Sequence, residues 1–269
     1  MAEHLSQQAP DGGKARRVYL LLRDAIVNGA HLPGDSLPGE LRLAESHGVS
    51  RVTIRRALDA LAGDGLIERR PGSGTVVRAP REEPGPIAAD FAKLMPQIVQ
   101  MGQRTGARLL AFSYGAAPPQ VARALQLAPD ARVQHAVRLR LIGELPFSHL
   151  TTHVPEDIAQ GFSEADLATT PMFRLFERSG VQVDHAKQSV SAVLAAPDVA
   201  EALDLAVGAP LIALTRVVYD VSGRGIEHLS ALYRPDRFRL EMTLARVGEG
   251  AERHWEPVLM PERQADETE

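Results

Sequence analysis

The sequence contains no cysteine in its 269 residues. Disulfides, thiolate metal sites, cysteine nucleophiles and cysteine-based redox sensing are therefore excluded. No apolar run approaches the roughly 18 residues that a membrane-spanning helix requires, and the first residues lack a basic segment followed by an apolar one. We therefore expect neither an export signal nor a membrane span, and we expect a cytoplasmic protein.

Charge is distributed unevenly along the chain. The formal net charge is −4, but residues 14–80 carry a net charge of +4 and residues 81–269 a net charge of −6. A basic N-terminal module on an acidic body is the balance that nucleic-acid binding by one end requires. Apolar residues make up 44% and charged residues 24% of the chain, which indicates a folded rather than a disordered protein.

Composition also divides the chain. Residues 79–89 contain three prolines and one glycine, a combination that breaks helices and is typical of a linker. After residue 248 the chain becomes polar again, and we expect a C-terminal tail over residues 249–269. Between these breaks the sequence predicts two domains, residues 14–78 and residues 90–248, in line with common domain sizes.

The second domain contains an internal repeat. Residues 119–127 recur as residues 197–205 at an offset of 78, and Pro155 and Glu156 recur as Pro235 and Asp236 at an offset of 80. Each copy has the pattern helix, strand, turn, strand. Two such hairpins predict an antiparallel sheet with helices on one face, and an α+β protein. The predicted strands are Val133–Leu141, Phe147–Val154, Leu211–Asp220 and Glu227–Arg234.

The first domain has the spacing of a helix-turn-helix. One apolar stripe ends at Asn28 and Gly29, a second helix is predicted over Gly39–His47, and Gly48 follows it. Glycine permits the left-handed turn between the helices, and the Ser50 hydroxyl can cap a third helix. Two short basic strands around a glycine-rich tip follow that helix, which is the pattern of a wing.

The third helix has two chemically different faces. Ile54, Ala57, Leu58 and Leu61 lie on one face, and the opposite face is basic. Taken alone, a solvated surface is the simpler interpretation of its arginines. The basic hairpin that follows favours DNA binding, because the first turns of a recognition helix meet base edges.

These motifs resemble a known family. Residues 18–78 resemble the winged-helix domain of GntR-family bacterial regulators, on Leu37–Glu40, Leu43–Glu45, Gly48–Leu58 and Gly65–Thr75. Residues 90–245 resemble the UTRA effector-binding domain of the HutC-type subfamily, which has a chorismate-lyase-like fold. This second resemblance rests on Arg138–Arg140, Pro146–Pro155, Gly208–Pro210, Arg216 and Glu227–Arg237.

The resemblance implies which residues meet DNA. It implies contacts from Arg51, Thr53 and Arg55, with the wing tip in or near the minor groove. The family has an arginine where this chain has Leu41, and Arg42 stands one place later. The predicted DNA-binding residues are Arg42, Ser50, Arg51, Val52, Thr53, Arg55, Arg56, Gly72, Ser73 and Gly74.

A second group of residues points to a small-molecule site. Arg138 and Arg140 share one strand face, and so do Glu227 and Tyr233, because their spacings are even. Spacing alone favours an arginine–glutamate ion pair that braces the sheet. The resemblance favours an effector site, because UTRA domains use matching positions for carboxylate or phosphate groups. The predicted effector-binding residues are Arg138, Arg140, His153, Thr170, Glu227 and Tyr233, with His153 placed by its repeat relation to Tyr233.

Two details concern the kind of effector. Leu150 stands where the sugar-phosphate members of the family have a carboxylate, and residues 169–173 are more apolar than the equivalent run in those members. We therefore expect a less polar carboxylic acid.

The leading hypothesis is a transcriptional regulator, expected to be a homodimeric repressor, that binds double-stranded operator DNA and a small anionic metabolite. We expect no cofactor, no metal ion and no enzymatic activity. The alternative is a lyase-like enzyme acting on a small carboxylic acid, but the sequence has no Ser–His–Asp order, nucleotide loop or metal cluster. A non-specific architectural DNA binder is a third hypothesis, and the modest positive charge argues against it.

Overall fold

The computed structural model describes residues 13–70, 74–79, 87–90, 106–249 and 253–258. Two units are described in turn, an N-terminal unit over residues 13–79 and a second unit over residues 106–233. The predicted wing-tip residues Gly72 and Ser73 lie outside the described residues. None of the described helices is long and apolar enough to cross a membrane.

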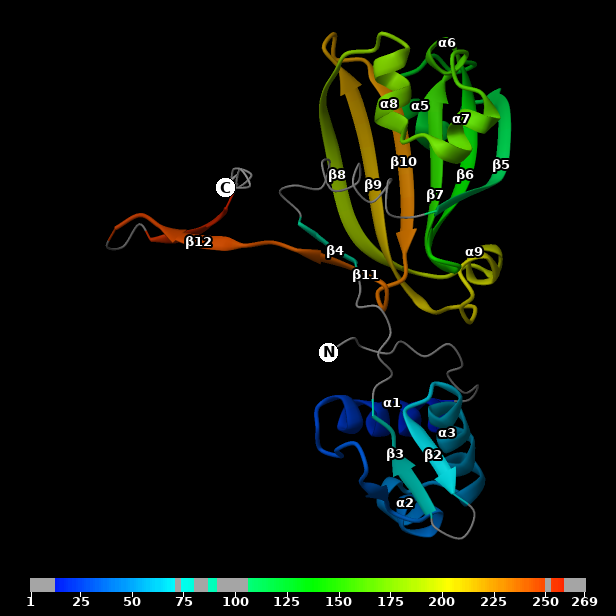
Figure 1. The fold of residues 1–269 in the computed structure, drawn as a ribbon, viewed down its shortest axis with the longest axis vertical. Helices are drawn as coiled ribbons and strands as arrows, with labels where there is room; N and C mark the ends of the chain where they lie inside the picture. The colour runs from blue at the N-terminus through cyan, green and yellow to red at the C-terminus, as the bar shows by residue number, and fades with distance from the viewer. Residues whose placement is uncertain (1–12, 71–73, 80–86, 91–105, 250–252, 259–269) are drawn as a thin grey trace, which may run out of the picture. The chain divides into compact units, whose positions relative to one another are not determined.

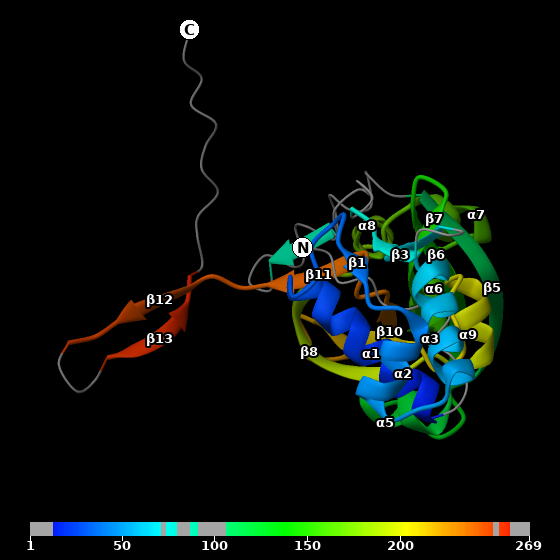
Figure 2. The same ribbon diagram turned by 90° about the horizontal axis from the view of Figure 1, so that it is seen from below.

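The N-terminal unit is a winged helix-turn-helix, with its helices seen together in Figure 2. Its elements are α1 (Gly13–Val27), β1 (Ser36–Leu37), α2 (Glu40–His47), α3 (Arg51–Gly63), β2 (Ile67–Arg70) and β3 (Gly74–Val77). The strands form an antiparallel sheet in the order β1-β3-β2. This confirms the predicted three helices and the wing hairpin.

The turn between α2 and α3 is built as the sequence predicts. Gly48 has a positive φ of 62°, and the N–H of Val49 then donates to the carbonyl of Ala44 at 3.0 Å. The Oγ of Ser50 accepts a hydrogen bond from the N–H of Thr53 at 3.2 Å and so caps α3. Ile54 is fully buried in the shared core of the three helices. These contacts fix the angle at which α3 leaves the turn.

The second unit is a six-stranded antiparallel sheet with short helices (Figure 1). The strands run in the order β5-β6-β7-β10-β9-β8. In chain order the elements are β5 (Gly106–Ala116), α5 (Pro119–Leu125), β6 (Arg132–Ile142), β7 (Leu145–Pro155), α6 (Glu156–Ala159), α7 (Glu164–Thr169), α8 (Met172–Arg178), β8 (Val183–Leu194), α9 (Pro197–Ala202), β9 (Pro210–Asp220) and β10 (Gly225–Tyr233).

The internal repeat is visible in the sheet order. One copy is β5-α5-β6-β7 and the other is β8-α9-β9-β10, so the sheet reads as one copy followed by the other in reverse. Gln126 and Asp204, which are 78 residues apart, both have a positive φ, at 56° and 55°. Strands β7 and β10 meet antiparallel in the middle. The repeat inferred from the sequence is therefore confirmed, and it also includes the two edge strands β5 and β8.

Helices cover both faces of this sheet. Helices α6, α7 and α8 pack their apolar side chains on one face, in a core that includes Ala136, Val154 and Val218. Helix α5 packs through Ala122 against Val133. Val133 points to the other face, because successive residues of a strand alternate. The sequence predicted helices on one face from the two repeat helices alone; α6, α7 and α8 were not predicted, and they cover the face opposite to that of α5.

Two further strand pairs complete the described residues. Strand β4 (Ile87–Asp90) pairs in parallel with β11 (Phe238–Glu241), so the expected linker ends in a strand. Strand β12 (Leu244–Val247) pairs antiparallel with β13 (His254–Pro257), and the two lie side by side in Figure 2. The expected start of the C-terminal tail, residue 249, thus falls inside a hairpin.

Candidate functional site

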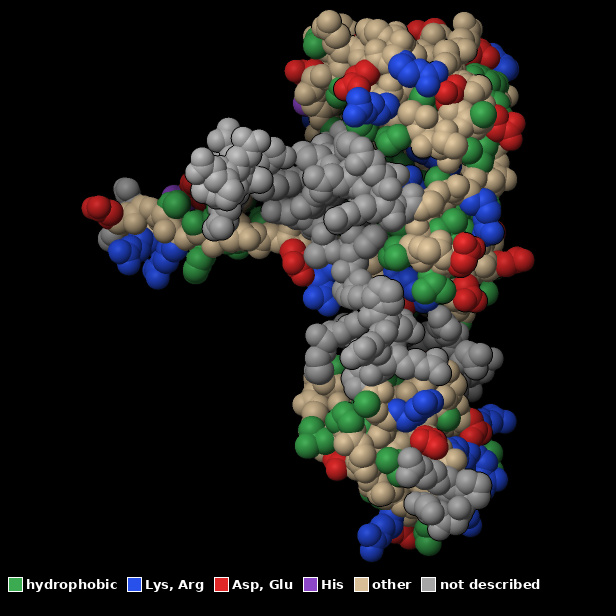
Figure 3. Space-filling view, viewed as in Figure 1, with side chains coloured by type: hydrophobic (Ala, Val, Ile, Leu, Met, Phe, Trp, Pro, Cys, Tyr) green, Lys and Arg blue, Asp and Glu red, His purple; other side chains and the backbone are tan. Residues whose placement is uncertain are grey.

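Helix α3 presents a basic surface to solvent. The side chains of Arg51 and Arg55 are 63% and 56% exposed, and Val52 and Arg56 are exposed beside them. The apolar face of the helix is buried in the core of the unit. The structure therefore brings together the predicted DNA-reading side chains of α3, and Figure 3 shows Lys and Arg side chains at the surface of this unit.

The carboxylate of Glu40 interacts with two arginines of α3 and with one arginine of the wing. Glu40, the first residue of α2, accepts hydrogen bonds from Arg55 through Nη2 at 3.0 Å and Nε at 3.3 Å. It also accepts one from Nη2 of Arg69 at 2.6 Å, and Nη2 of Arg51 lies 3.9 Å away. These cations, Arg55 first, keep the pKa of the Glu40 carboxyl below its usual value.

Glu40 therefore connects three elements. It lies on α2, Arg55 lies on α3, and Arg69 lies on wing strand β2, where it also pairs with Asp59. The sequence analysis assigned roles to the arginines of α3 but none to Glu40 or Arg69. The sequence does contain an indication of a role for both residues, because Glu40 belongs to the motif that carries the family resemblance and Arg69 lies close to the wing tip.

The remaining predicted DNA-binding residues lie around this network. Arg42 is exposed on α2, and Leu41, which replaces the family arginine, is 61% exposed beside it. The hydroxyls of Ser50 and Thr53 are 2.9 Å apart at the start of α3. Gly74 opens β3 with a positive φ of 89°, a backbone conformation that favours glycine.

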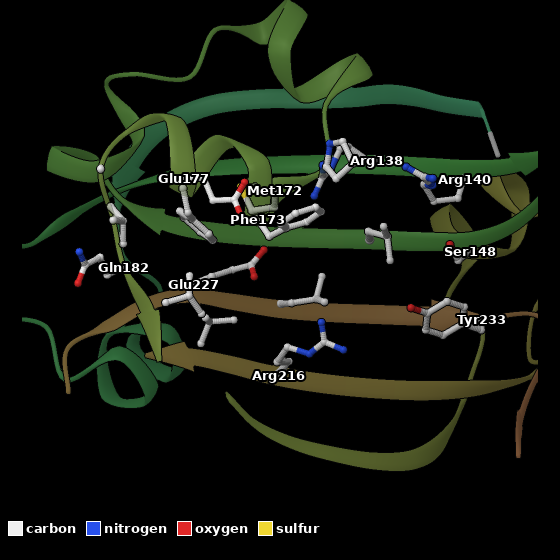
Figure 4. A pocket seen from close by; sticks show the side chains of 18 of the residues that line it. Arg138, Arg140, Ser148, Met172, Phe173, Glu177, Gln182, Arg216, Glu227 and Tyr233 are labelled. Atoms are coloured by element: carbon white, nitrogen blue, oxygen red, sulfur yellow. The ribbon is translucent and has the colours of Figure 1, made fainter. Parts of the chain in front are cut away.

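The second unit contains a cavity of about 830 Å³. Its floor is formed by β6, β7, β9 and β10, and its roof by α8 and the segment that follows (Figure 4). The lining residues are Arg138, Arg140, Phe147, Ser148, Leu150, Pro171, Met172, Phe173, Phe176, Glu177, Gly180, Val181, Gln182, Val183, Arg216, Val218, Glu227, Leu229 and Tyr233.

Four of the predicted effector residues meet in this cavity. Arg138 and Arg140 line it from β6, and Glu227 and Tyr233 from β10. Arg140 is the strand partner of Ser148, and Ser148 is the partner of Tyr233, so these three form one row across the sheet. The sequence analysis missed Ser148. Ser148 is two residues from Leu150, a position already related to the effector, and this even spacing indicates that both side chains lie on the same face of β7.

The cavity is rich in buried charge. Burial lowers the pKa of the Arg138 guanidinium, which the attraction of Glu227 partly opposes. Burial raises the pKa of the Glu227 carboxyl, against the attraction of Arg216 and then Arg138. Burial also raises the pKa of the Tyr233 hydroxyl. Three arginines thus share the cavity with the buried carboxylate of Glu227 and the exposed carboxylate of Glu177, and the remaining positive charge favours an anionic ligand.

Two buried polar atoms in the cavity have no hydrogen-bond partner. They are the Nε of Arg138 and the Oγ of Ser148. Arg216 instead donates to Oε1 of Gln188 through Nε at 2.9 Å and Nη2 at 2.6 Å. An ion pair that braces the sheet, the interpretation favoured by spacing alone, is therefore not formed through the Nε of Arg138. Buried donors without partners are rare in folded proteins and indicate a missing ligand or water.

Two predicted effector residues lie elsewhere. Thr170 does not line the cavity, although its neighbour Pro171 does. His153 lies on the opposite face of the sheet, where its ring packs 4.9 Å from the ring of His135 and 6.2 Å from that of His228. The prediction that these two side chains line the pocket is therefore wrong.

The error for His153 has a simple geometric reason. The offset of 80 that the sequence suggests for the strands matches His153 with Tyr233. In the structure Ser148 and Leu150 of β7 face the cavity, as do Glu227 and Leu229 of β10, which corresponds to an offset of 79. A shift of one residue moves a strand side chain to the other face.

Two family descriptions match this chain. Residues 14–77 match the family described as bacterial regulatory proteins, gntR family. Residues 100–239 match the UTRA domain. The first match contains the helix-turn-helix and the wing strands, and the second contains every strand that lines the cavity.

Proteins with similar sequences bear the names of transcriptional regulators. The HTH-type transcriptional repressor NagR of Bacillus subtilis is 27% identical over 217 residues, covering 81% of this chain and 88% of that protein. An HTH-type transcriptional regulator of Mycobacterium tuberculosis is 30% identical over 226 residues, covering 81% of each chain. The histidine utilization repressor of Pseudomonas aeruginosa is 28% identical over 227 residues, covering 84% and 88%.

Solved structures are similar as well. PhnF from Mycobacterium smegmatis has a TM-score of 0.50 and 25% identity, covering 83% of this chain and 97% of that one. The ligand-binding domain of a GntR-family regulator from Bordetella bronchiseptica has a TM-score of 0.50 and 27% identity, covering 52% and 91%. The winged helix, the cavity-bearing sheet and these similarities lead to one assignment: the chain belongs to the GntR family of bacterial regulatory proteins and carries a UTRA domain.

Proposed function

We propose that this protein is a cytoplasmic, homodimeric repressor whose affinity for its operator is controlled by an anionic metabolite bound in the cavity. The observation that carries the proposal is the pair of unsatisfied buried donors, Arg138 Nε and Ser148 Oγ, in a cavity with excess positive charge. A regulator without an effector has no physical reason to keep such a site, because burying a cation with an unsatisfied donor destabilises the fold.

The exposed arginines of α3 support the DNA-binding part. An arginine can donate two parallel hydrogen bonds to O6 and N7 of guanine, which contributes about 1–3 kcal/mol of discrimination. Arg51 and Arg55 lie in the first turns of the helix expected to enter the major groove. Val52, exposed between them in sequence, can meet a thymine methyl group.

The homodimer follows from the symmetry of operators. Two-fold operators are bound by two-fold proteins, and symmetric dimers are the commonest oligomers. For an effector to regulate such a dimer, it must bind the DNA-bound and DNA-free states with different affinities.

The enzyme alternative receives less support from the cavity. Among the described lining residues, the serine is Ser148, and no histidine lies among them to act as its base. The described residues contain no group of three His, Asp or Glu side chains that could hold a metal ion. A general acid–base role for Glu227 would still be testable by following turnover of a bound metabolite with mass spectrometry.

A two-part experiment tests the proposal. The operator is first selected from a random DNA library, and fluorescence anisotropy then measures its binding by wild type, Arg138→Ala and Arg123→Ala, with and without metabolite extract. We expect the extract to change wild-type and Arg123→Ala binding, because Arg123 is exposed on α5, and to leave Arg138→Ala binding unchanged. Failure to select any preferred sequence, or an equal response of all three proteins, would contradict the proposal.

A further inference from the structure

Two apolar side chains in the first turns of α2 and α3 are exposed to solvent. Leu41 and Val52 are each 61% exposed. The other leucine, isoleucine and valine side chains of these two helices are at most 3% exposed. A single exposed leucine is ordinary in a folded protein, so the surroundings of these two residues decide what their exposure means.

Both side chains stand next to the arginine network that Glu40 organises. Leu41 follows Glu40 on α2, and Val52 follows Arg51 on α3. The Glu40 carboxylate accepts hydrogen bonds from Arg55 at 3.0 and 3.3 Å and lies 3.9 Å from the Nη2 of Arg51. These contacts hold the first turn of α2 beside the first two turns of α3. Each helix thus has one exposed apolar residue next in sequence to a member of this network.

The core determines which way these first turns face. Leu41 comes two residues before Leu43, and Val52 comes two residues before Ile54, and both later residues are buried in the core. Two residues correspond to roughly 200° of rotation about an α-helix. Leu41 and Val52 therefore point nearly opposite to the buried side chains, on the outer side that meets DNA when α3 enters the major groove.

The neighbouring charges favour DNA over a protein partner. Arg42 follows Leu41, Arg51 precedes Val52, and Arg56 lies one turn further along α3, and all three arginines are exposed. The buried centre of a protein–protein interface is depleted of charged residues. The phosphates on either side of a DNA groove instead require cations, so apolar side chains between arginines suit a groove.

The base edges in the major groove contain one apolar group. Thymine presents a C5 methyl group there, whereas the other three bases present only hydrogen-bond donors and acceptors. Leucine and valine have no polar side-chain atoms, and covering a donor or acceptor without a partner costs free energy. A leucine or valine that meets base edges therefore favours thymine over cytosine, the pyrimidine without a methyl group.

We infer that Leu41 and Val52 are specificity-determining residues, and that each contacts the C5 methyl group of a thymine in the operator. Leu41 extends the base-reading surface from α3 to the first turn of α2. The inference rests on the proposed entry of α3 into the major groove. It predicts thymines in each half of the operator, beside the positions that the arginines read.

Removal of single methyl groups from DNA tests the inference. The operator is selected from a random library with the full-length protein, and each thymine is then replaced in turn by deoxyuridine, which lacks only the C5 methyl group. Fluorescence anisotropy measures the affinity for each DNA. Loss of a contacted methyl group should weaken binding by about fourfold, which is the contribution of one buried carbon. The protein is unchanged in this comparison, so the result is independent of how any variant folds.

Alanine variants assign each contact to a residue. Leu41→Ala should bind the thymine and deoxyuridine forms of one position equally, and Val52→Ala should do so at a different position. The control is Leu32→Ala, which shortens a leucine of similar exposure, 58%, outside these helices. It should keep the full methyl dependence at every position. Circular dichroism checks that each variant is folded.

A substitution with the opposite chemistry separates a base contact from a phosphate contact. Leu41→Arg introduces two donors that match O6 and N7 of guanine, so repeated selection should replace thymine with guanine at the position assigned to Leu41. An arginine beside phosphate would instead tighten binding to operator and random DNA alike and steepen the dependence on salt. That second result would refute a base contact by Leu41.

Two further results would overturn the inference. One is equal binding of the thymine and deoxyuridine forms at every position, and the other is a methyl dependence that Leu41→Ala leaves intact. Either result leaves the proposed regulator standing if one operator is selected, because the arginines of α3 can read bases by themselves. Failure to select any preferred sequence would instead contradict the proposed function, and the inference with it.

Discussion

Glu40 and Arg55, fifteen residues apart and on different helices, are joined by two hydrogen bonds of 3.0 and 3.3 Å. The pair fixes the guanidinium of Arg55 on α3, the helix predicted to read DNA, although that side chain remains 56% exposed. Exposed ion pairs contribute little to stability. We therefore interpret Glu40 as a residue that orients Arg55 and Arg69 before DNA arrives, which reduces the entropy lost on binding.

Replacing this carboxylate should reduce specificity more than affinity. Glu40→Gln frees Arg55 and Arg69 and removes one negative charge, so binding to random DNA should tighten while the operator-to-random ratio falls by about tenfold, or about 1.4 kcal/mol. Fluorescence anisotropy on both DNAs measures the ratio. The control is Glu45→Gln, an exposed carboxylate on the same helix. An unchanged ratio in Glu40→Gln would show that the network has no part in recognition.

The arginines of α3 should read bases rather than only phosphates. Arg51→Ala and Arg55→Ala should each lose about 1–3 kcal/mol of operator preference, enough to remove most specific binding, while circular dichroism remains unchanged. Titrations at several salt concentrations separate the two kinds of contact, because a lost phosphate contact lowers the salt slope by about one. If both variants kept the full preference for one sequence, α3 would not be the recognition helix.

Arg138, whose buried Nε has no hydrogen-bond partner, should reduce stability in the absence of a ligand. Arg138→Met replaces a buried cation, whose pKa is lowered chiefly by desolvation, with an apolar chain of similar length. We expect the variant to be more stable by about 1–3 kcal/mol in urea unfolding without metabolite, and to lose its response to metabolite. Arg108→Met, at an exposed position of β5, should change stability by less than about 0.5 kcal/mol. A destabilised Arg138→Met would mean that Arg138 braces the fold.

Acid should weaken the second unit through His153. Burial, with smaller contributions from His135 and His228, lowers the pKa of His153 to about 4, against about 6.5 in an unfolded chain. The unfolded state therefore binds more protons between these values, so this contribution to stability is complete above pH 6.5 and is lost as the pH drops toward 4.

The His153→Phe variant tests this pH dependence. Its unfolding free energy, measured in urea at pH 7, 5.5 and 4.5, should fall less steeply than that of wild type. The control is His185→Gln, which changes an exposed histidine of the edge strand β8. Parallel curves for wild type and His153→Phe would refute the role of His153.

Much of the fold follows from local patterns in the sequence. Gly48, Ser50 and Ile54 mark the helix-turn-helix because backbone freedom, capping and burial each act within a few residues. The four inner strands follow from the repeat and from turns with hairpin chemistry. The outer strands β5 and β8 were missed, and β8 is exposed along most of its length. An edge strand that buries little has no clear alternation of apolar and polar residues.

The residues of the candidate site could be predicted where the alternation of side chains along a strand decides which face of the sheet they occupy. Even spacing correctly placed Arg138, Arg140, Glu227 and Tyr233 on one face of the sheet. His153 was misplaced because two strands of a repeat can differ by one residue, and the sequence does not reveal such a shift. Contacts between distant segments, such as the hydrogen bonds of Arg69 to Glu40, have no local signature at all.

The floor and the roof of the cavity come from different parts of the fold, the floor from central strands of the sheet and the roof from the segment between the two repeat copies. Strands β6, β7, β10 and β9, which carry the arginines, are hydrogen-bonded to neighbours on both sides within the sheet. Residues 156–182, which supply the roof, occur in one repeat and have no counterpart in the other. Leu175 and Phe176 of this segment are core residues, whereas Phe173 lines the cavity and is only half-buried, so it can change with less effect on the strands beneath it. Exchange of such roof side chains would therefore reshape the cavity while leaving unchanged the strands that carry its arginines.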